Sequence, residues 1–447
     1  MSPAAKKRVL LVSHNFPPTG SGGVHRPVKF ARYLREFGWE VEVLTVRDIR
    51  YHAYDPSLLD EIPDVPVHRP GSLEPLRLNW LLGWRPPPLP SPPESFADLE
   101  RRAAGNAARP ASTAGRLYKT LTDHLFLPDT QVGWVPFALA RAIRLLRRRR
   151  FDVVLTTSPP ESCHLVGLAL KLMTGCRWVA DFRDAWSRHH LRRRLFAYHR
   201  WVNKLLEKWV LRRADGVIAN TEGMAPAMES LAGRPLSLLV LRNGFDPADF
   251  GEPLPAAHAD DYVMVHNGSF RGGRRARAIL EGLAGARARS PEFAARARLY
   301  LLGINRSDDL ALAEELGLAD VVFSTGYVRH ADAMRACLGA DLLVLAMSRE
   351  EGASLVPGKL YEYLGAGRPI LAAIPPGEAA DIISGTTEGA TVVAPDNPAA
   401  VADGFMARFS AAAGGVKEYE TKAGVIDTYN RRTQVAVLAE FLKSVLK

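Results

Sequence analysis

The strand–helix–strand order at the start of the chain is the feature that most constrains its fold. The run "RVLLVS" (residues 8–13) is typical of a buried strand, and "PVKFARYLREFGW" (27–39) places apolar residues at helical spacing after a Pro/Gly loop. "EVEVLTV" (40–46) then predicts a second strand. Two strands joined by a helix lie parallel, so this segment predicts a parallel sheet covered by helices.

The same alternation continues and later starts again. In the first half, "DVVLTTS", "RWVADF", "GVIAN" and "SLLVLRNG" predict strands, with helices at 162–174 and about 195–213. Residues 247–261 lack periodicity and are rich in Pro, Ala and Asp, which predicts a linker. After it, alternating strands and helices resume, the helices being expected at 275–290, 308–317 and 330–339. We therefore expect two doubly wound α/β domains, which also suits 447 residues.

These patterns give the expected domain boundaries. The first domain covers residues 1–246 and the second residues 262–430. Within the first domain, the Pro/Ala/Arg-rich segment 83–115 is interpreted as an insertion that forms a mobile or partly disordered loop. Ligands of such sheets bind outside the carboxyl ends of the strands.

The charge of the chain is unevenly placed. Residues 1–250 hold 37 Lys and Arg against 24 Asp and Glu, whereas the remainder holds 21 against 24. A basic first half suggests an anionic partner, which is a membrane surface, a nucleic acid or a phosphorylated acceptor. Segments 137–151 and 188–213 interleave arginine with apolar and aromatic residues, as membrane-surface helices, nucleic-acid contacts or core helices with a charged outer face do.

The cysteines, the histidines and the hydropathy limit the class of protein to which the chain can belong. Three scattered cysteines, at positions 163, 176 and 337, favour neither a disulfide framework nor a zinc site, and they suit a reducing cytoplasm. The histidines show no metal-binding spacing, so no metal site is expected. No stretch approaches the length of about 20 apolar residues needed to span a bilayer.

Two glycine-rich loops follow the first predicted strand of each half. Gly22 and Gly23 precede the first helix, and Gly268 stands in "HNGSFRGGRRAR", where Arg274 and Arg275 open a helix. Glycine lets backbone amides approach a ligand, and a helix N-terminus with arginines suits phosphate. The alternative is a flexible connection for the first loop and a solvated basic helix start for the second.

Two further motifs carry charged residues near predicted strand ends. In "DFRDAW", Asp181 or Asp184 could contact a substrate, or form an Asp–Arg pair or a helix N-cap instead. In "PGKLYEYLGAG", Lys359 and Glu362 are three residues apart and reach the same end of the sheet. A lysine there suits phosphate and a carboxylate suits ribose hydroxyls. The alternative is an exposed ion pair.

Taken in order, these segments resemble a known family over almost the full length of the chain. "NFPPTGSGGVHRPVKFARYLREFGWEVEVLT", "WVADFRDAW", "ADGVIANTEGM", "LRNGFD", "NGSFRGGR", "STGYVRHADAM" and "GKLYEYLGAGRPIL" resemble the retaining glycosyltransferases of family 4. The forms "DFRDAW" and "KLYEYLGAG" resemble the bacterial branch that builds surface polysaccharide and lipid-linked sugars. The resemblance implies the GT-B fold, in which two Rossmann-like domains face each other across a cleft. It also implies a terminal helix, within 431–447, that crosses back to the first domain.

The resemblance also implies a donor site for a nucleotide-diphosphate sugar of the UDP or GDP type. Its phosphate-binding cations would be Arg274 or Arg275 together with Lys359, and its ribose-binding carboxylate Glu362. Gly268 belongs to the same loop as these arginines, and Gly22 and Gly23 would face the diphosphate from the first domain. No metal or cofactor is implied.

The catalytic residues follow the family pattern less closely. The family signature has two glutamates separated by seven residues, and the position that pairs with Glu362 is Ser354. Glu351, three residues earlier, is the candidate for the sugar-contacting acid, and the alternative is that the role of the first glutamate is lost. The histidine that many relatives carry after the middle strand is replaced by "FRD", which makes Asp184 the candidate for an acceptor or sugar contact.

The expected function is therefore transfer of a sugar from a nucleotide-diphosphate donor to an acceptor hydroxyl with retention of configuration. The acceptor would be a sugar or a lipid-linked sugar, in polysaccharide, cell-envelope or glycolipid biosynthesis. The expected place is the cytoplasm, at the inner face of the plasma membrane. The alternatives are a GT-B epimerase or phosphorylase, and a non-catalytic module that binds nucleotide sugars or nucleic acid; nucleic acid is the less favoured partner.

Overall fold

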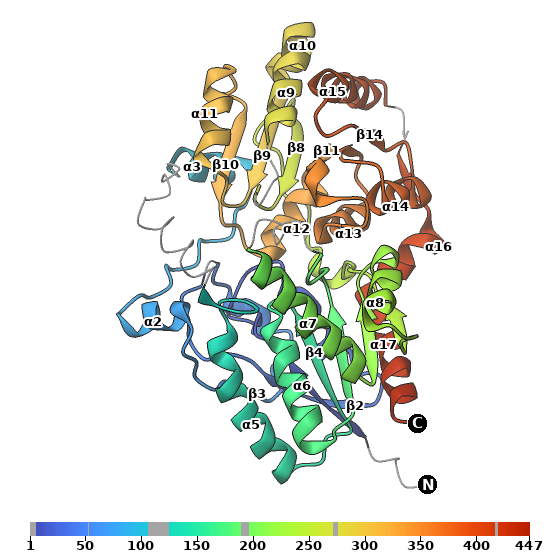
Figure 1. Cartoon of the computed structure of the whole chain (residues 1–447). Helices are drawn as coiled ribbons and strands as arrows, with labels where there is room; N and C mark the ends of the chain where they lie inside the picture. The colour runs from blue at the N-terminus through green and yellow to red at the C-terminus, as the bar shows by residue number, and fades with distance from the viewer. Residues whose placement is uncertain (1–5, 52, 106–124, 189–195, 271–275, 416–418) are drawn as a thin grey trace. The chain divides into compact units, whose positions relative to one another are not determined.

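The computed structural model describes residues 6–51, 53–105, 125–188, 196–270, 276–415 and 419–447. The chain forms two compact units, each with its own sheet (Figure 1). The N-terminal unit consists of the described parts of Met1–Leu89, Ser112–Asn243 and Arg431–Lys447. The C-terminal unit consists of the described parts of Pro90–Ala111 and Gly244–Asn430.

The sheet of the N-terminal unit has seven strands in the order β3-β2-β1-β4-β5-β6-β7. All neighbouring strands pair in parallel, and most of their side chains are buried, as in a sheet covered on both faces. The strands are β1 (Lys7–Val12), β2 (Trp39–Leu44), β3 (Val67–His68), β4 (Val153–Ser158), β5 (Trp178–Phe182), β6 (Gly216–Ala219) and β7 (Leu238–Val240).

Helices cover both faces of this sheet. One core contains apolar side chains of α5, α6, α7 and α8, and the other contains those of α1 and α17. The helices of the unit are α1 (His25–Tyr33), α2 (Pro75–Leu81), α5 (Val135–Arg148), α6 (Ser162–Thr174), α7 (Ala197–Arg213), α8 (Ala225–Ala232) and α17 (Arg431–Val445). The last helix packs Val435, Leu438 and Leu442 into the core beside β1, although it follows the C-terminal unit in the chain.

The sheet of the C-terminal unit has six strands in the order β10-β9-β8-β11-β12-β14, all parallel. Its strands are β8 (Tyr262–Asn267), β9 (Ala297–Leu302), β10 (Val322–Gly326), β11 (Leu342–Ala346), β12 (Ile370–Ala373) and β14 (Thr391–Val393). A separate antiparallel pair joins β13 (Thr387–Glu388) to β15 (Glu420–Thr421).

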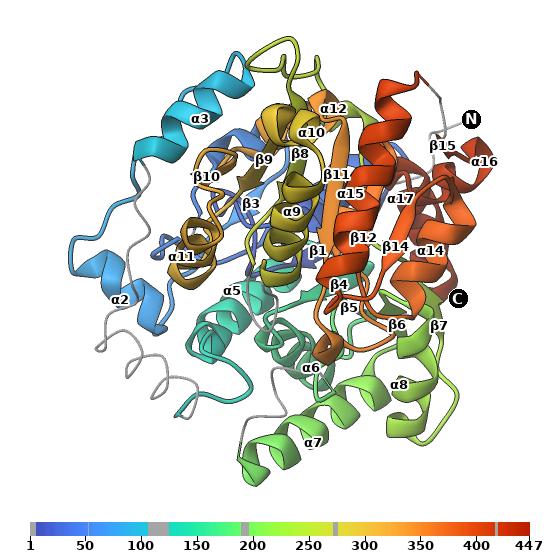
Figure 2. The ribbon, with the colours of Figure 1, turned by 90° about the horizontal axis from the view of Figure 1, so that it is seen from above.

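The helices of this unit also form two layers. One core receives side chains from α3, α12, α13 and α14, and the other from α9, α10, α11 and α15 (Figure 2). The helices are α3 (Phe96–Gly105), α9 (Arg277–Arg289), α10 (Pro291–Arg296), α11 (Ser307–Glu315), α12 (His330–Gly339), α13 (Gly358–Ala366), α14 (Glu378–Thr386), α15 (Pro398–Ala413) and α16 (Ala423–Ile426).

Helix α3 differs from the loop expected over residues 83–115. It comes before most of the N-terminal unit in sequence, yet it packs against β10 of the C-terminal unit. Phe96 and Leu99 are fully buried there, the Phe96 ring lies 4.5 Å from the Tyr300 ring, and Glu100 accepts a hydrogen bond from the Tyr300 hydroxyl at 2.6 Å. Burial of two large apolar side chains orders a segment that its Pro/Ala-rich surroundings had marked as a loop.

Candidate functional site

Helix α13 places Lys359 and Glu362 at the carboxyl end of β8, in the C-terminal unit. Lys359 Nζ lies 3.1 Å from Nε2 of His266, and Glu362 Oε2 accepts a hydrogen bond from Asn267 Nδ2 at 3.0 Å. Leu360 and Leu364, which are one turn apart on the same helix, are buried in the core. The apolar face of α13 therefore turns its lysine and glutamate toward the strand end.

The contacts of His266 define which ring nitrogen meets the lysine. Nδ1 lies 2.9 Å from the carbonyl oxygen of Val344, which can only accept, so Nδ1 carries the hydrogen. Nε2 then directs its lone pair at the Lys359 ammonium, and the ring stacks on Phe270 with centroids 4.1 Å apart. This neutral contact orients Lys359 while leaving its positive charge intact.

Three glycines with positive φ end the three adjacent strands β8, β9 and β10. Their φ values are 96° at Gly268, 148° at Gly303 and 70° at Gly326. A Cβ on Gly303 would come within 2.9 Å of the Gly268 carbonyl carbon and the Ser269 nitrogen, and a Cβ on Gly268 within 3.1 Å of Lys359 Nζ. Glycine is required here because the loops pack against each other and against the lysine.

The cluster formed by Gly268, His266, Asn267, Lys359 and Glu362 is the candidate donor site. It combines a cation beside a close-packed glycine loop with a carboxylate that is partly exposed. A cation and backbone amides suit phosphate oxygens, and a carboxylate suits vicinal hydroxyls. The sequence had grouped Gly268, Lys359 and Glu362, and the structure brings these three together. Arg274 and Arg275 lie outside the described residues.

Glu351 lies in the loop that follows β11 in the same unit. It ends the 3-10 helix η6 (Arg349–Glu351), and its Oε2 accepts a hydrogen bond from the Ser348 backbone nitrogen at 2.8 Å. Glu351 is only 8% exposed, whereas Ser354 is exposed. One carboxylate oxygen of Glu351 thus caps its own loop, and the Ser-x-x-Glu spacing of Ser348 and Glu351 is that of a capping box.

In the N-terminal unit, Arg183 holds the loop of Gly22 and Gly23. Its guanidinium donates from Nε to the Ser158 carbonyl at 2.7 Å, from Nη2 to that of Pro159 at 2.8 Å, and from Nη1 to that of Gly23. A Cβ on Gly23 would lie 3.5 Å from this guanidinium, and one on Gly22 would meet no atom within 4 Å. Burial lowers the pKa of Arg183 from its usual value.

The two acids of "DFRDAW" have different surroundings. Asp181 is fully buried and accepts two hydrogen bonds from the Arg26 guanidinium, at 2.7 and 3.0 Å, and one from the Thr157 hydroxyl at 2.7 Å. Asp181 therefore forms the Asp–Arg pair that the sequence left open. Asp184 is partly exposed, and its charge acts to raise the pKa of the neighbouring Arg183. The structure thus brings Asp184, Gly22 and Gly23 to the surroundings of one arginine.

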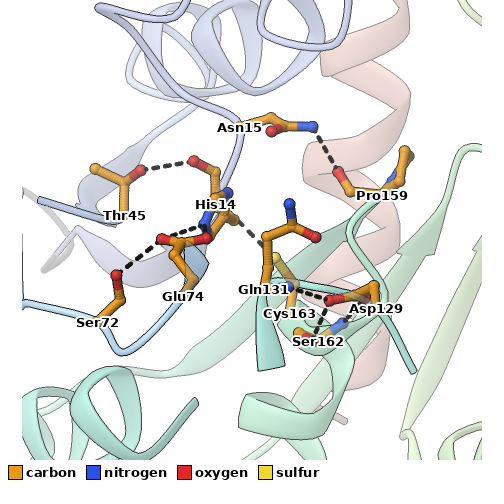
Figure 3. Close-up of polar contacts among 10 residues, drawn as sticks. All are labelled: His14, Asn15, Thr45, Ser72, Glu74, Asp129, Gln131, Pro159, Ser162 and Cys163. Atoms are coloured by element: carbon orange, nitrogen blue, oxygen red, sulfur yellow. Dashed lines mark hydrogen bonds and ion pairs between the residues drawn. The ribbon is translucent and has the colours of Figure 1, made fainter. Parts of the chain in front are cut away.

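A buried histidine–glutamate pair lies at the end of β1 (Figure 3). His14 Nε2 lies 3.0 and 3.2 Å from the two carboxylate oxygens of Glu74, and Glu74 also accepts from the Ser72 hydroxyl at 2.8 Å. Burial alone would lower the pKa of His14, but the Glu74 carboxylate, with smaller contributions from Asp129 and Asn15, outweighs burial and the pKa is raised. The backbone nitrogen of His14 donates to Cys163 Sγ at 3.3 Å.

The sequence did not predict this pair. His14 stood out only as a histidine after the first strand, and Glu74 is sixty positions away in a segment without a motif. Asp129, also drawn in Figure 3, accepts two hydrogen bonds from Ser162. One comes from the Ser162 backbone nitrogen at 2.9 Å and the other from the Ser162 hydroxyl at 2.6 Å. Contacts between residues so far apart leave no local pattern that could have revealed them.

Comparison with known proteins identifies the fold. Residues 97–249 match the model of Glycosyltransferase Family 4, and no curated protein sequence gives a significant match. The solved structure of HepE from Anabaena in complex with UDP and glucose is 15% identical and has a TM-score of 0.62, covering 98% of this chain and 100% of that one. Sucrose-phosphate synthase from Thermosynechococcus elongatus is 16% identical with a TM-score of 0.59, covering 99% and 96%.

A third similar structure is WaaG, a glycosyltransferase involved in lipopolysaccharide biosynthesis. It is 14% identical with a TM-score of 0.54, covering 97% of this chain and 95% of that one. At these identities the structures show the fold, which is the GT-B arrangement of two parallel-sheet α/β units. The expectation of a GT-B fold is confirmed.

Proposed function

We propose that the protein is a glycosyltransferase that moves a sugar from a nucleotide-diphosphate donor to an acceptor hydroxyl with retention of configuration. The observation that carries the proposal is the candidate donor site, where Lys359 and Glu362 meet the Gly268 loop at the end of β8. UDP is the first nucleotide to test, because the similar HepE structures contain UDP or UDP-glucose. GDP is the second.

Each residue of the site has a proposed role. Lys359 binds the diphosphate and stabilises the charge that develops as the nucleotide leaves. Glu362 binds the ribose hydroxyls, and its hydrogen bond from Asn267 fixes the carboxylate. Arg274 and Arg275 are proposed to supply further cations to the diphosphate, and Gly22 and Gly23 are proposed as a second glycine loop that binds it. The proposal includes no metal ion and no cofactor.

The contacts to the sugar and the acceptor are assigned to Asp184 and Glu351. Asp184 is partly exposed beside the Arg183-bound loop, which suits a contact to a hydroxyl. Glu351 is held by its hydrogen bond from the Ser348 backbone nitrogen and is proposed to contact the sugar. A carboxylate held in this way is oriented before substrate arrives.

The proposed acceptor is a sugar or lipid-linked sugar used in polysaccharide, cell-envelope or glycolipid biosynthesis. The basic first half of the chain supports an anionic partner, and the cytoplasmic face of the plasma membrane is the proposed location. Among the described residues, no helix is long and apolar enough to cross a membrane.

Nucleotide binding tests the site directly. Isothermal titration of UDP and GDP against the wild-type chain should give binding by one of them, and Lys359→Met should weaken it about tenfold or more. Glu362→Gln should weaken it less, because the amide still accepts from Asn267. The matched control is Lys422→Met, since Lys422 contacts Glu388 at 4.0 Å and no residue of the candidate donor site. Equal affinities for Lys359→Met and Lys422→Met would refute the assignment of the phosphate site.

Product analysis then tests the reaction. The assay combines the protein with an acceptor and the diphosphate sugar of the nucleotide that binds. The proposal predicts a new glycoside that keeps the anomeric configuration of the donor, as read by proton NMR. Isomerisation of the donor sugar without an acceptor would indicate an epimerase, and a sugar phosphate formed from inorganic phosphate would indicate a phosphorylase. Binding with no product of any kind would favour a non-catalytic module.

A further inference from the structure

Helix α7 (Ala197–Arg213) has one face that is packed inside the N-terminal unit. Val210 and Leu211 are buried in the core shared with α6 and α8. Asn203 accepts a hydrogen bond from the Trp186 indole at 2.7 Å, and Glu207 accepts one from the Ser187 backbone nitrogen at 3.0 Å. Asn203 and Glu207 on this face therefore have partners within the unit, and the face packs against the rest of the unit.

The opposite face of α7 exposes large aromatic side chains. Trp201 is 66% exposed, Trp209 53% and Tyr198 51%. At about 100° per residue, the members of this face lie within an arc of roughly 100° on the helix. They are Tyr198, Trp201, Leu205, Lys208, Trp209 and Arg212. We call this set the α7 stripe; in Figures 1 and 2 the helix lies on the outside of its unit.

The charge of α7 is of one sign on its outer surface. Its basic residues are Arg200, Lys204, Lys208, Arg212 and Arg213, and its single acid, Glu207, is buried. A hollow of about 370 Å³ beside the helix is lined by Arg188, Arg200, Lys204, Lys208, Ser187 and Leu231 among others. A hollow with four cationic side chains and a serine suits a phosphate group.

We propose that the α7 stripe and this basic hollow dock the protein on a membrane of anionic phospholipids. Trp and Tyr are enriched where a protein meets the lipid–water boundary, and lysine and arginine attract anionic headgroups. The stripe inserts its rings at headgroup depth, and the hollow receives a lipid phosphate. This inference deepens the proposed function and rests on it for the lipid-linked acceptor, whereas the docking itself requires no sugar transfer.

The geometry favours a membrane over single-stranded nucleic acid. Nucleic-acid channels place aromatic rings along a groove that follows the phosphate backbone. Here Trp201 and Trp209 are eight residues apart on the outer surface of a helix about 25 Å long, and the hollow takes basic residues but none of these rings. Such a convex stripe of rings and cations suits a flat interface.

Vesicle co-sedimentation with the full chain tests the proposal. Wild-type protein should bind vesicles of phosphatidylglycerol and phosphatidylcholine and should bind phosphatidylcholine alone at least about tenfold more weakly. Trp201→Ala with Trp209→Ala, and separately Lys204→Glu with Lys208→Glu, should each reduce binding about tenfold or more. Both pairs are solvent-facing, and unchanged thermal melting would show that the variants fold.

Two controls separate the α7 stripe from other surfaces. Leu172→Ala with Met173→Ala removes exposed apolar side chains at the end of α6, and Arg147→Ala with Arg148→Ala removes two charges at the end of α5. Both should bind vesicles within about twofold of wild type. If the α5 variant loses binding while the tryptophan variant keeps it, the stripe is not the docking surface. Preference for an RNA oligonucleotide over vesicles would equally overturn the proposal.

UDP titration of the same variants keeps the two proposals distinct. The tryptophan and lysine variants of α7 should bind UDP like wild type, because α7 and the candidate donor site belong to different units. Loss of vesicle binding with intact UDP binding supports docking by α7. Intact vesicle binding in a chain that binds no nucleotide would leave the docking surface standing and refute the proposed donor site.

Discussion

Each unit places a histidine at the carboxyl end of its first strand, and the two histidines differ in what they contact. His14, after β1, meets a fully buried carboxylate, Glu74, and its pKa is raised. His266, in β8, donates to a backbone carbonyl and faces the Lys359 ammonium through its lone pair. The carboxyl end of the first strand therefore holds a histidine paired with a carboxylate in one unit and a histidine facing a lysine in the other.

The two units also differ in how their other charged residues are paired and exposed. In the N-terminal unit the Arg26–Asp181 pair is also buried, and it joins helix α1 to strand β5. In the C-terminal unit Lys359 and Glu362 are partly exposed, and Gly268, which has a positive φ, lies against Lys359. Buried and mutually paired charges stabilise the fold, whereas partly exposed charges beside bare backbone can bind a ligand.

The largest effect is expected from breaking the Arg26–Asp181 pair. Asp181→Asn leaves the buried Arg26 guanidinium without a counter-charge, which should lower the free energy of unfolding by about 3 to 5 kcal/mol. Urea denaturation followed by tryptophan fluorescence measures this change. Asp320→Asn is the control, because the exposed Asp320–Arg287 pair should be worth less than about 1 kcal/mol. Equal losses in the two variants would mean that burial does not distinguish these pairs.

A smaller effect is expected from a methyl group in the glycine loops. Gly303→Ala puts a Cβ against the Gly268 and Ser269 backbone and forces φ near 148°, which should cost about 2 to 3 kcal/mol and weaken UDP binding. Gly317→Ala is the control, because Gly317 also has a positive φ, 67°, but its Cβ would lie in open space. Calorimetric unfolding and UDP titration measure both properties. If both variants bind UDP equally well, close packing of the Gly268 loop does not support nucleotide binding.

The smallest effect is expected from Glu74→Gln, and it should depend on pH. Because the folded pKa of His14 is raised, the pair's stabilisation is fully present below the unfolded histidine pKa of about 6.5 and is lost as pH rises through the folded value. The variant should therefore lose about 1 kcal/mol more stability at pH 5.5 than at pH 9. Denaturation midpoints at the two pH values test this. A loss that grows with pH would contradict a cationic His14.

Local periodicity was enough to predict most secondary structure. The helices expected at 162–174 and 330–339 have those bounds in the structure, and those expected at 195–213 and 275–290 begin two residues later. Such segments are readable because the spacing of apolar residues alone decides which face is buried.

The candidate donor site was partly readable for the same reason. Lys359 and Glu362 are one turn apart on a helix whose apolar face is plain in the sequence, so their common direction followed from local geometry. Their partners His266 and Asn267 come from a strand more than ninety residues away. That part of the site depends on which strand lies next to β11 and α13 in the folded protein. No local pattern in the sequence predicts this neighbour.

The sequence by itself therefore determined the two α/β units, the order of their elements and the helix that carries Lys359 and Glu362. Only the tertiary structure decided that α3 joins the C-terminal unit and that His14 pairs with Glu74. The physical reason is distance along the chain. Periodicity records how a segment buries its own face, whereas a buried ion pair or a docked helix depends on a partner that only folding brings near.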